Sequence, residues 1–77
     1  MKDILHKIIV SIVAKDEAVE ITEEEEQGVV NLTIQVDPED MGKVIGKEGK
    51  VIRAIRNVMR IPAINEGKKI YINIKEV

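Results

Sequence analysis

The sequence contains no cysteine, tryptophan or phenylalanine, and only one tyrosine and one histidine. Without cysteine the chain forms neither a disulfide nor a thiolate metal site, and a lone histidine, His6, argues against a zinc cluster. No apolar run approaches the ~18 residues of a membrane-spanning helix. Asp3 and His6 interrupt the N-terminal apolar stretch and no cleavage site follows, so we expect no signal peptide and a cytoplasmic protein.

The charges of the chain are unevenly distributed. The formal net charge is −2, yet residues 16–40 hold ten acidic side chains and no lysine or arginine, whereas residues 43–60 hold six basic side chains and one acid, Glu48. At physiological salt, charges more than about 8 Å apart are largely screened. A ligand at residues 43–60 therefore meets positive charge, which favours a polyanion; the alternative is an ordinary solvated helix face.

Hydrophobic periodicity predicts one helix and two strands in the first half of the chain. Residues 3–14 carry aliphatic side chains at helical spacing, which indicates a helix that covers the core. Residues 18–23 and 30–36 alternate apolar and polar side chains, which predicts an antiparallel hairpin. Residues 24–28 would then form its acidic loop. The consecutive glutamates Glu23–Glu26 repel one another, so we interpret them as solvated and not as metal ligands.

The middle of the chain is organised around two glycines three positions apart, Gly46 and Gly49. The preceding Asp37–Asp40 is typical of a helix start, with an N-cap acceptor, a proline and acids in the first turn. Glycine tolerates the left-handed backbone of a tight turn, so we predict a turn between two helices, the second opening at Gly49. Free N–H groups at a helix start favour a bound phosphate, and Lys47 and Lys50 add full charges.

From Lys50 the helical period returns. The apolar residues of this second helix share one arc, which we expect to face the core: Val51, Ile52, Ile55, Val58 and Met59. The remaining arc forms a basic ridge: Lys50, Arg53, Arg56, Asn57 and Arg60. Pro62 is predicted to end or kink the helix near Arg60. Residues 70–74 alternate as a last strand.

The predicted element order is α-β-β-α-α-β. The connection through two helices has the length of a crossover, so the last strand should lie parallel to the strand at residues 30–36. This order predicts an α+β fold, a two-layer sandwich with a three-stranded mixed sheet and helices on one face. We expect a single domain over residues 1–77, with an N-terminal helix at 3–14 and a βααβ core at about 29–75.

Residues Val44–Ile52, in sequence VIGKEGKVI, resemble the V-I-G-x-x-G-x-x-I signature of KH domains. These are RNA- and single-stranded-DNA-binding modules whose GXXG loop clamps about four nucleotides. The element order resembles the type II version of the domain. The longer string Pro38–Gly49 closely resembles a group of small single-KH bacterial proteins, and the resemblance covers nearly the whole chain.

The resemblance implies roles for individual residues. Those that would hold the RNA backbone are Gly46, Lys47, Glu48, Gly49, Lys50, Lys43 and Arg53. Those that match the floor of a nucleobase groove are Val44, Ile45 and Ile52. The resemblance implies no catalytic residue, metal or cofactor. Glu48 places a carboxylate beside the phosphate site, where it opposes Lys47.

The resemblance also implies partners and a role in the cell. It implies binding of single-stranded RNA, an RNA-chaperone or post-transcriptional role, and a link to cell shape and cell-wall homeostasis. Relatives self-associate or pair with a larger KH protein, so we expect a homodimer or a heterodimer. Residues 61–65, which include Pro62, depart from the alanine-rich continuation usual in the family.

Two other functions remain as alternatives. A KH-like module can serve protein–protein interaction without nucleic acid. An enzyme is disfavoured because no nucleophile or metal set is evident, and Gly46–Gly49 lacks the spacing of a Walker motif. With one tyrosine as the only aromatic residue, base stacking should be scarce. We therefore expect bases to rest on aliphatic side chains, and we expect weak, salt-sensitive binding by one copy. If the acidic loop Glu23–Glu26 borders the groove, it should repel the strand and confine it to the basic side.

Overall fold

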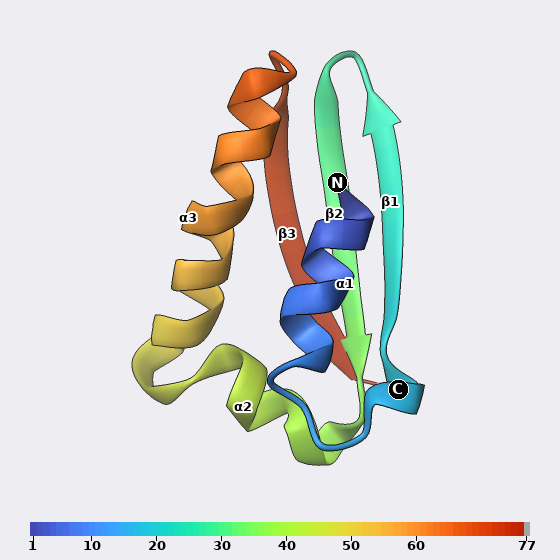
Figure 1. The fold of residues 1–77 in the computed structure, drawn as a ribbon, viewed down its shortest axis with the longest axis vertical. Coiled ribbons are helices and arrows are strands. Elements are labelled where there is room, and N and C mark those ends of the chain that lie inside the picture. Colours follow the sequence, from blue (N-terminus) through green and yellow to red (C-terminus); the bar gives the residue numbers. More distant parts are fainter. Residues whose placement is uncertain (77) are drawn as a thin grey trace.

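The computed structural model describes residues 1–76 and confirms the predicted α+β architecture. The elements are α1 (Lys2–Val10), β1 (Glu20–Glu26), β2 (Val29–Val36), α2 (Met41–Ile45), α3 (Lys50–Asn65) and β3 (Lys69–Glu76). Short 3₁₀ turns precede β1, α2 and α3. The helices lie on one face of the sheet (Figure 1).

The sheet has the order β1-β2-β3. β1 pairs with β2 antiparallel, and β2 pairs with β3 parallel. The parallel pair is what the crossover through α2 and α3 requires. β2 is therefore the central strand, and its alternate side chains Val30, Leu32, Ile34 and Val36 are completely buried.

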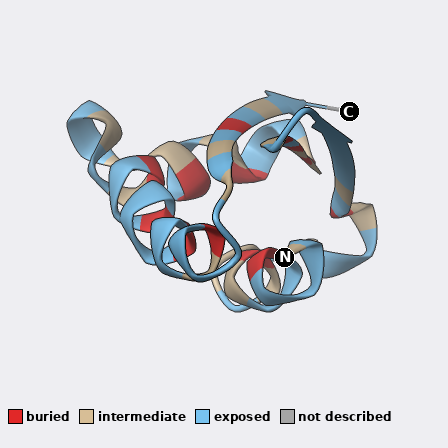
Figure 2. Ribbon diagram, turned by 90° about the horizontal axis from the view of Figure 1, so that it is seen from above, coloured by how far each residue is buried: buried red, intermediate tan, exposed pale blue. Residues whose placement is uncertain are grey.

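The core lies between this face of β2 and the inner faces of the helices. Figure 2 shows the buried parts of the helices turned toward the sheet. Leu5 and Ile9 of α1 and Ile52, Ile55 and Met59 of α3 complete one cluster with the strand residues. Within residues 1–76 no helix covers the opposite face of the sheet (Figure 1), so polar residues such as Asn31 and Asn73 stay exposed there.

The first helix ends earlier than predicted. α1 stops at Val10 instead of Ala14, and the Ser11 hydroxyl donates to the carbonyl of Ile8 at 2.6 Å. The backbone N–H groups of Ala14 and Lys15 donate to the carboxylate of Asp40, at 3.0 Å each. Because these two donors are used by a residue from another element, the helix does not extend through them.

The predicted acidic loop is wrong. Glu24, Glu25 and Glu26 lie in β1 and face Asn31, Val30 and Val29 of β2. The turn consists only of Gln27 and Gly28, whose positive φ angles of 51° and 78° suit a two-residue hairpin. Glutamates are tolerated here because β1 is an edge strand, where charged side chains discourage pairing with another sheet.

The predicted end of the second long helix is also wrong, because α3 continues through Pro62 to Asn65. A proline at position 62 removes the N–H that would reach the carbonyl of Val58. Val58 is half exposed, so water can satisfy that carbonyl. Its exposure also corrects the expectation that Val58 faces the core. The C-terminal end of α3 is capped by a backbone hydrogen bond, which the N–H of Lys68 donates to the carbonyl of Ala63 at 2.8 Å.

Candidate nucleic-acid interface

The turn between α2 and α3 is built from backbone angles that favour glycine. Gly46 has φ 76° and ψ 171°, Glu48 has φ 57° and ψ 25°, and Gly49 has φ 74° and ψ 18°. A Cβ on Gly46 would lie 2.8 Å from the backbone nitrogen of Val51. Gly46 is therefore required by both conformation and space, whereas a Cβ on Gly49 would meet nothing closer than 3.9 Å.

Gly49 is the N-cap of α3, a helix of 16 residues. Gly49 has no side chain to cap the helix, and within residues 1–76 no acidic residue lies in the first turn of α3. The first N–H groups of a helix have no partner within the helix and carry a partial positive charge. This end of α3 therefore has the properties of an anion-binding site.

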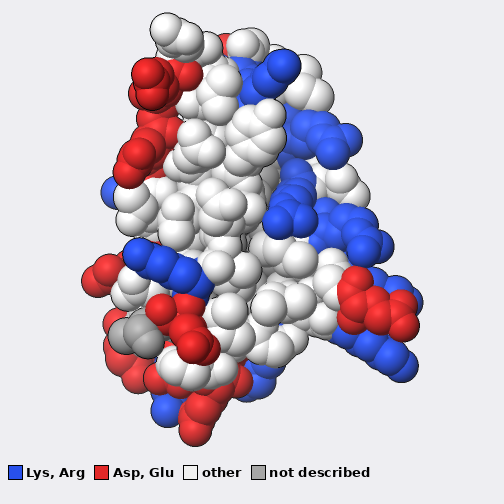
Figure 3. All heavy atoms as spheres, turned by 180° about the vertical axis from the view of Figure 1, so that it is seen from behind, with Lys and Arg blue, Asp and Glu red and all other residues white. Residues whose placement is uncertain are grey.

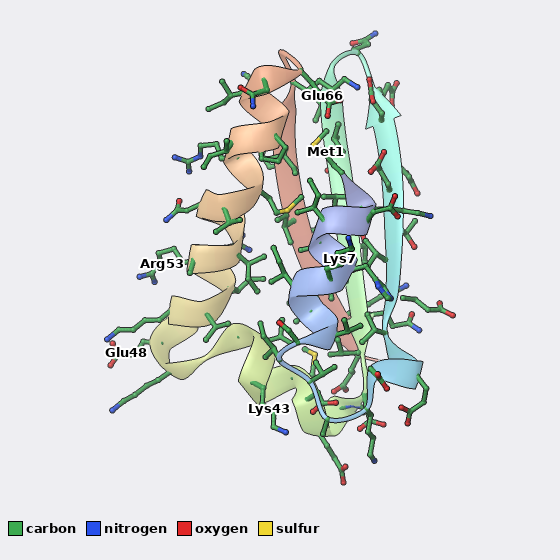
Figure 4. All side chains as sticks on the ribbon, viewed as in Figure 1. Met1, Lys7, Lys43, Glu48, Arg53 and Glu66 are labelled. Carbon is green, nitrogen blue, oxygen red and sulfur yellow. The ribbon has the colours of Figure 1, made fainter. Side chains whose placement is uncertain are left out.

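Four of the predicted backbone-binding side chains surround this turn. Lys47, Glu48 and Lys50 are exposed. Figure 4 shows Glu48 at the tip of the turn and Arg53 projecting from α3 on the same side of the molecule. The Nη2 of Arg53 donates to the carbonyl of Glu48 at 3.2 Å. Arg53 therefore stabilises the left-handed conformation of Glu48 with one donor, and its other N–H groups remain available to a ligand.

Lys43 lies on α2, on the other side of the turn, and is exposed. Its Nζ is 3.5 Å from Oδ1 of Asp40, a carboxylate whose residue is only 1% exposed. This ion pair directs Lys43 toward the base of α2. Lys43 is therefore less available to a ligand than Lys47 and Lys50, for which the described residues offer no ion-pair partner.

Asp40 connects the turn-bearing helix to the rest of the fold. Its two carboxylate oxygens accept the N–H groups of Ala14 and Lys15. These bonds, the one from Ala14 first, lower the pKa of Asp40 below its usual value, and Lys43 adds to the effect. Glu39, one residue earlier, accepts from Lys15 Nζ at 2.7 Å and raises the pKa of Lys15. The position of α2 is thus fixed by the segment that follows α1.

The three residues predicted to line a nucleobase groove differ in exposure. Val44 is completely buried and Ile52 is 6% exposed, so both belong to the core. Ile45 is half-buried and packs against that core. Of the three, only Ile45 presents appreciable surface beside the turn.

A groove that sequence reasoning missed lies between α3 and β3. One cavity of about 260 Å³ is lined by Arg56 and Arg60 of α3 and by four consecutive residues of β3, Ile70–Asn73. A second, of about 380 Å³, adjoins it and shares Arg60, Ile70 and Tyr71. Consecutive strand residues line a cavity together only where the backbone edge of the strand faces it, and β3 is an edge strand.

The free edge of β3 offers hydrogen-bonding groups to this groove. Ile70, Ile72 and Ile74 turn their side chains toward the core side, and their N–H and C=O groups point away from β2. Arg56 Nη2 donates to the carbonyl of Ile72 at 3.3 Å. An edge of this kind is a template for further hydrogen bonds. The sequence feature that could have indicated this groove is the helical spacing of Arg53, Arg56 and Arg60, which places the three arginines along one side of α3.

The acidic side chains lie at the opposite edge of the sheet. Figure 3 shows them along β1 and the basic side chains along the α3 side. Glu25 accepts from Lys68 Nζ at 2.8 Å, and this bond is the main reason why the pKa of Lys68 is raised. β2 and β3 lie between β1 and the α3–β3 groove, although Glu25 reaches Lys68, which lines the larger cavity. The confinement of a bound strand by these glutamates stays a prediction.

Other kinds of site find little support in the part of the chain described. Residues 1–76 contain no group of three or more His, Asp or Glu side chains placed to hold a metal ion. None of their helices has the length and apolar character needed to cross a membrane.

A mixed three-stranded sheet with helices on one face, whose βααβ core carries a glycine turn between its two helices, defines a KH domain of type II. Residues 2–74 match the family described as KhpA/KhpB, KH domain, and the chain belongs to this family. It is 43% identical to the RNA-binding protein KhpA of Clostridium perfringens over 74 residues, 96% of this chain and 99% of the relative. The corresponding protein of Clostridium acetobutylicum is 39% identical over the same shares, and that of Aquifex aeolicus is 34% identical over 99% of this chain and 96% of its own. The family is one of RNA-binding KH proteins and not of enzymes.

Proposed function

We propose that this protein binds single-stranded RNA and holds its sugar-phosphate backbone at the turn Gly46–Gly49. The observation that carries the proposal is the uncapped N-terminus of α3, flanked by the exposed cations Lys47 and Lys50. Backbone N–H groups and full charges together suit a phosphate. The relatives named above, which are described as RNA-binding proteins, support the same function.

The path of the strand is proposed to follow α3. From the turn, Arg53, Arg56 and Arg60 continue the positive charge on exposed positions, and the groove beside β3 offers unpaired backbone groups to base edges. Bases reach such an edge only when they are unpaired, which favours a single strand over a duplex. Glu48 opposes Lys47, so we expect one copy to bind weakly and with strong salt dependence.

The cellular role is proposed from family membership. We expect a cytoplasmic RNA chaperone or post-transcriptional regulator, linked to cell shape and cell-wall homeostasis. The alternative, a KH-like module for protein contacts without nucleic acid, predicts no retention of RNA even at low salt.

Self-association is proposed as part of this function. Val58, Ile61 and Ile64 of α3 are spaced three apart on one face of the helix and are 51%, 62% and 64% exposed. Exposed aliphatic residues grouped in this way suit a contact with a second copy or with a larger KhpB-type KH protein. Two linked sites raise the effective concentration of RNA and so offset weak binding by one.

The proposal is tested by Lys47→Asp combined with Glu48→Asp. The turn keeps its glycines, so the fold should persist, while the charge beside the phosphate site is reversed. We expect RNA retention in a filter assay to be lost. For the wild type, the slope of log K against log salt should be about −3, the value for four phosphates on a single strand.

The control is Lys7→Asp combined with Glu17→Asp, which makes the same charge change on exposed residues of α1 and the following segment. This variant should bind within about threefold of the wild type. Unchanged RNA binding by the turn variant would contradict the assignment of the turn. Equal losses of RNA affinity in both variants would show that the effect comes from the change in net charge and not from the turn.

A further inference from the structure

The strand β1 has a free edge on the side of the sheet away from β3. The order β1-β2-β3 leaves β1 paired on one side only, and Figure 1 shows it as the outermost strand of the sheet. All of its residues except Ile21 are exposed. Because an edge strand presents a row of unpaired N–H and C=O groups, β1 can accept a further strand.

A cavity of about 280 Å³ opens at the start of this edge, between α1 and β1. Its lining residues are Lys2, Asp3, His6, Val19, Glu20 and Ile21. Val19 is 7% exposed and Ile21 is half-buried, so these two provide an apolar floor. Asp3 and Glu20 are exposed at the rim, where Lys2 offsets one of their charges. The cavity suits a lysine or arginine side chain, whose aliphatic stem covers apolar surface while its charged head reaches a carboxylate.

The glutamates of β1 form two rows, because side chains alternate between the faces of a strand. Glu23 and Glu25 lie on the helix side and already bind donors of the protein. Glu23 accepts the backbone N–H of Lys2 at 3.0 Å, and Glu25 accepts from Lys68 Nζ at 2.8 Å. The second row, on the open face, consists of Glu20, Glu24 and Glu26. None of these three forms an ion pair with another of residues 1–76, so their charges remain available to a partner.

We propose that the free edge of β1 binds an extended, lysine- or arginine-rich segment of another protein, which adds a fourth strand to the sheet and places one cationic side chain in the cavity beside α1. In such strand addition, backbone hydrogen bonds supply affinity and side-chain pockets supply specificity. The glutamates repel a second β1 or any acidic strand and attract a strand of opposite charge. The inference is independent of RNA binding, because it concerns the edge of the sheet opposite to β3.

The probe is a fluorescein-labelled peptide of eight residues that alternates lysine and threonine, and the full-length protein is titrated into it while anisotropy is measured. We expect saturable binding of this peptide and none of the same peptide with glutamate in place of lysine. Glutamine in the open-face row (Glu20→Gln, Glu24→Gln and Glu26→Gln together) should weaken binding about tenfold, because three exposed ion pairs are lost. The control removes three charges from other exposed positions and should bind within about twofold of the wild type. Its substitutions are Glu39→Gln, Glu66→Gln and Glu76→Gln.

Hydrogen exchange distinguishes strand addition from a loose electrostatic contact. The bound peptide should slow exchange about tenfold at those amides of β1 that point away from β2, and leave α2 unchanged. Binding without this protection would overturn strand addition. No binding of the lysine peptide, or equal losses in the two triple variants, would overturn the site. A mass by light scattering that rises with protein concentration and falls when the peptide is added would assign the edge to β3 of a second copy and overturn the proposal of a different protein.

Discussion

Alanine substitution of three neighbouring glycines should change stability in different directions. Gly42 lies inside α2, and a Cβ there would meet nothing within 4 Å. Gly49 is left-handed, with room for a Cβ. Gly46 is left-handed, and a Cβ would press on Val51. We therefore expect Gly42→Ala to stabilise the protein, Gly49→Ala to cost little, and Gly46→Ala to cost most.

The magnitudes follow from the backbone angles. Alanine in a helix is worth about 0.5–1 kcal/mol over glycine, which is the gain expected at Gly42. At Gly49 the left-handed conformation costs about 1–2 kcal/mol, partly offset by the reduced freedom of the unfolded chain, which leaves about 1 kcal/mol. At Gly46, φ 76° with ψ 171° is a region used almost only by glycine. Its strain and the overlap with the backbone of α3 together cost about 2–5 kcal/mol.

Urea unfolding followed by far-ultraviolet circular dichroism measures these differences. A chain of this length has a free energy of unfolding of about 4–12 kcal/mol, so Gly46→Ala should remove a large part of it. The order of midpoints should be Gly42→Ala, wild type, Gly49→Ala and Gly46→Ala, from highest to lowest. Equal costs at Gly46 and Gly49 would refute the argument that space, and not only conformation, requires a glycine at the first position.

Two other substitutions test the remaining contacts. Asp40→Asn should be less stable than the wild type at neutral pH, because the carboxylate accepts two backbone N–H groups. The pKa of Asp40 is lowered on folding, so the stabilisation by this carboxylate is present above the ordinary pKa of 3.8 and is lost as the pH falls through the lower folded value. Between pH 6 and pH 2, the free energy of unfolding should therefore fall less for Asp40→Asn than for the wild type. An exposed-site control, Asp16→Asn, should follow the wild type. Ile61→Glu places a charge on the exposed apolar face of α3, so light scattering should give the mass of one chain for this variant and of two for the wild type; a wild-type monomer would exclude the homodimer.

The main elements of the fold were predictable because their patterns are local. Alternation along residues 30–36 and 70–74 identified β2 and β3, and the crossover length fixed their parallel pairing. The short helix before Gly46 followed from Asp37, whose side chain accepts the N–H of Glu39 at 2.9 Å. These features depend on residues close in the chain, which is why sequence was sufficient for them.

The errors arose where distant residues or local solvation decide the outcome. The early end of α1 depends on Asp40, more than 24 positions further along the chain. The glutamates of β1 have low strand propensity, but pairing with β2 at an exposed edge outweighs it. Pro62 removes a single donor near the end of α3, too little to break a helix packed on the sheet.

The turn of the candidate site was predicted, and the groove beside it was not. The spacing of Gly46 and Gly49 in the sequence was enough to predict the turn. The groove joins residues from α3 and β3 that no short motif connects. Alternation alone would have placed Tyr71 on the open face of the sheet, but its position beside Arg60 follows from how the crossover docks α3 against β3.

Because acidic side chains gather on β1 and basic side chains on α3, the molecule has a large electric dipole. With a net charge of −2, the whole protein repels RNA weakly from afar. Within about a Debye length, however, a phosphate responds to the nearer edge of the sheet. An approaching strand therefore turns the protein so that α3 leads and β1 trails. Collisions on the wrong edge are short-lived, which gives a small protein of negative charge a preferred orientation of encounter with a polyanion.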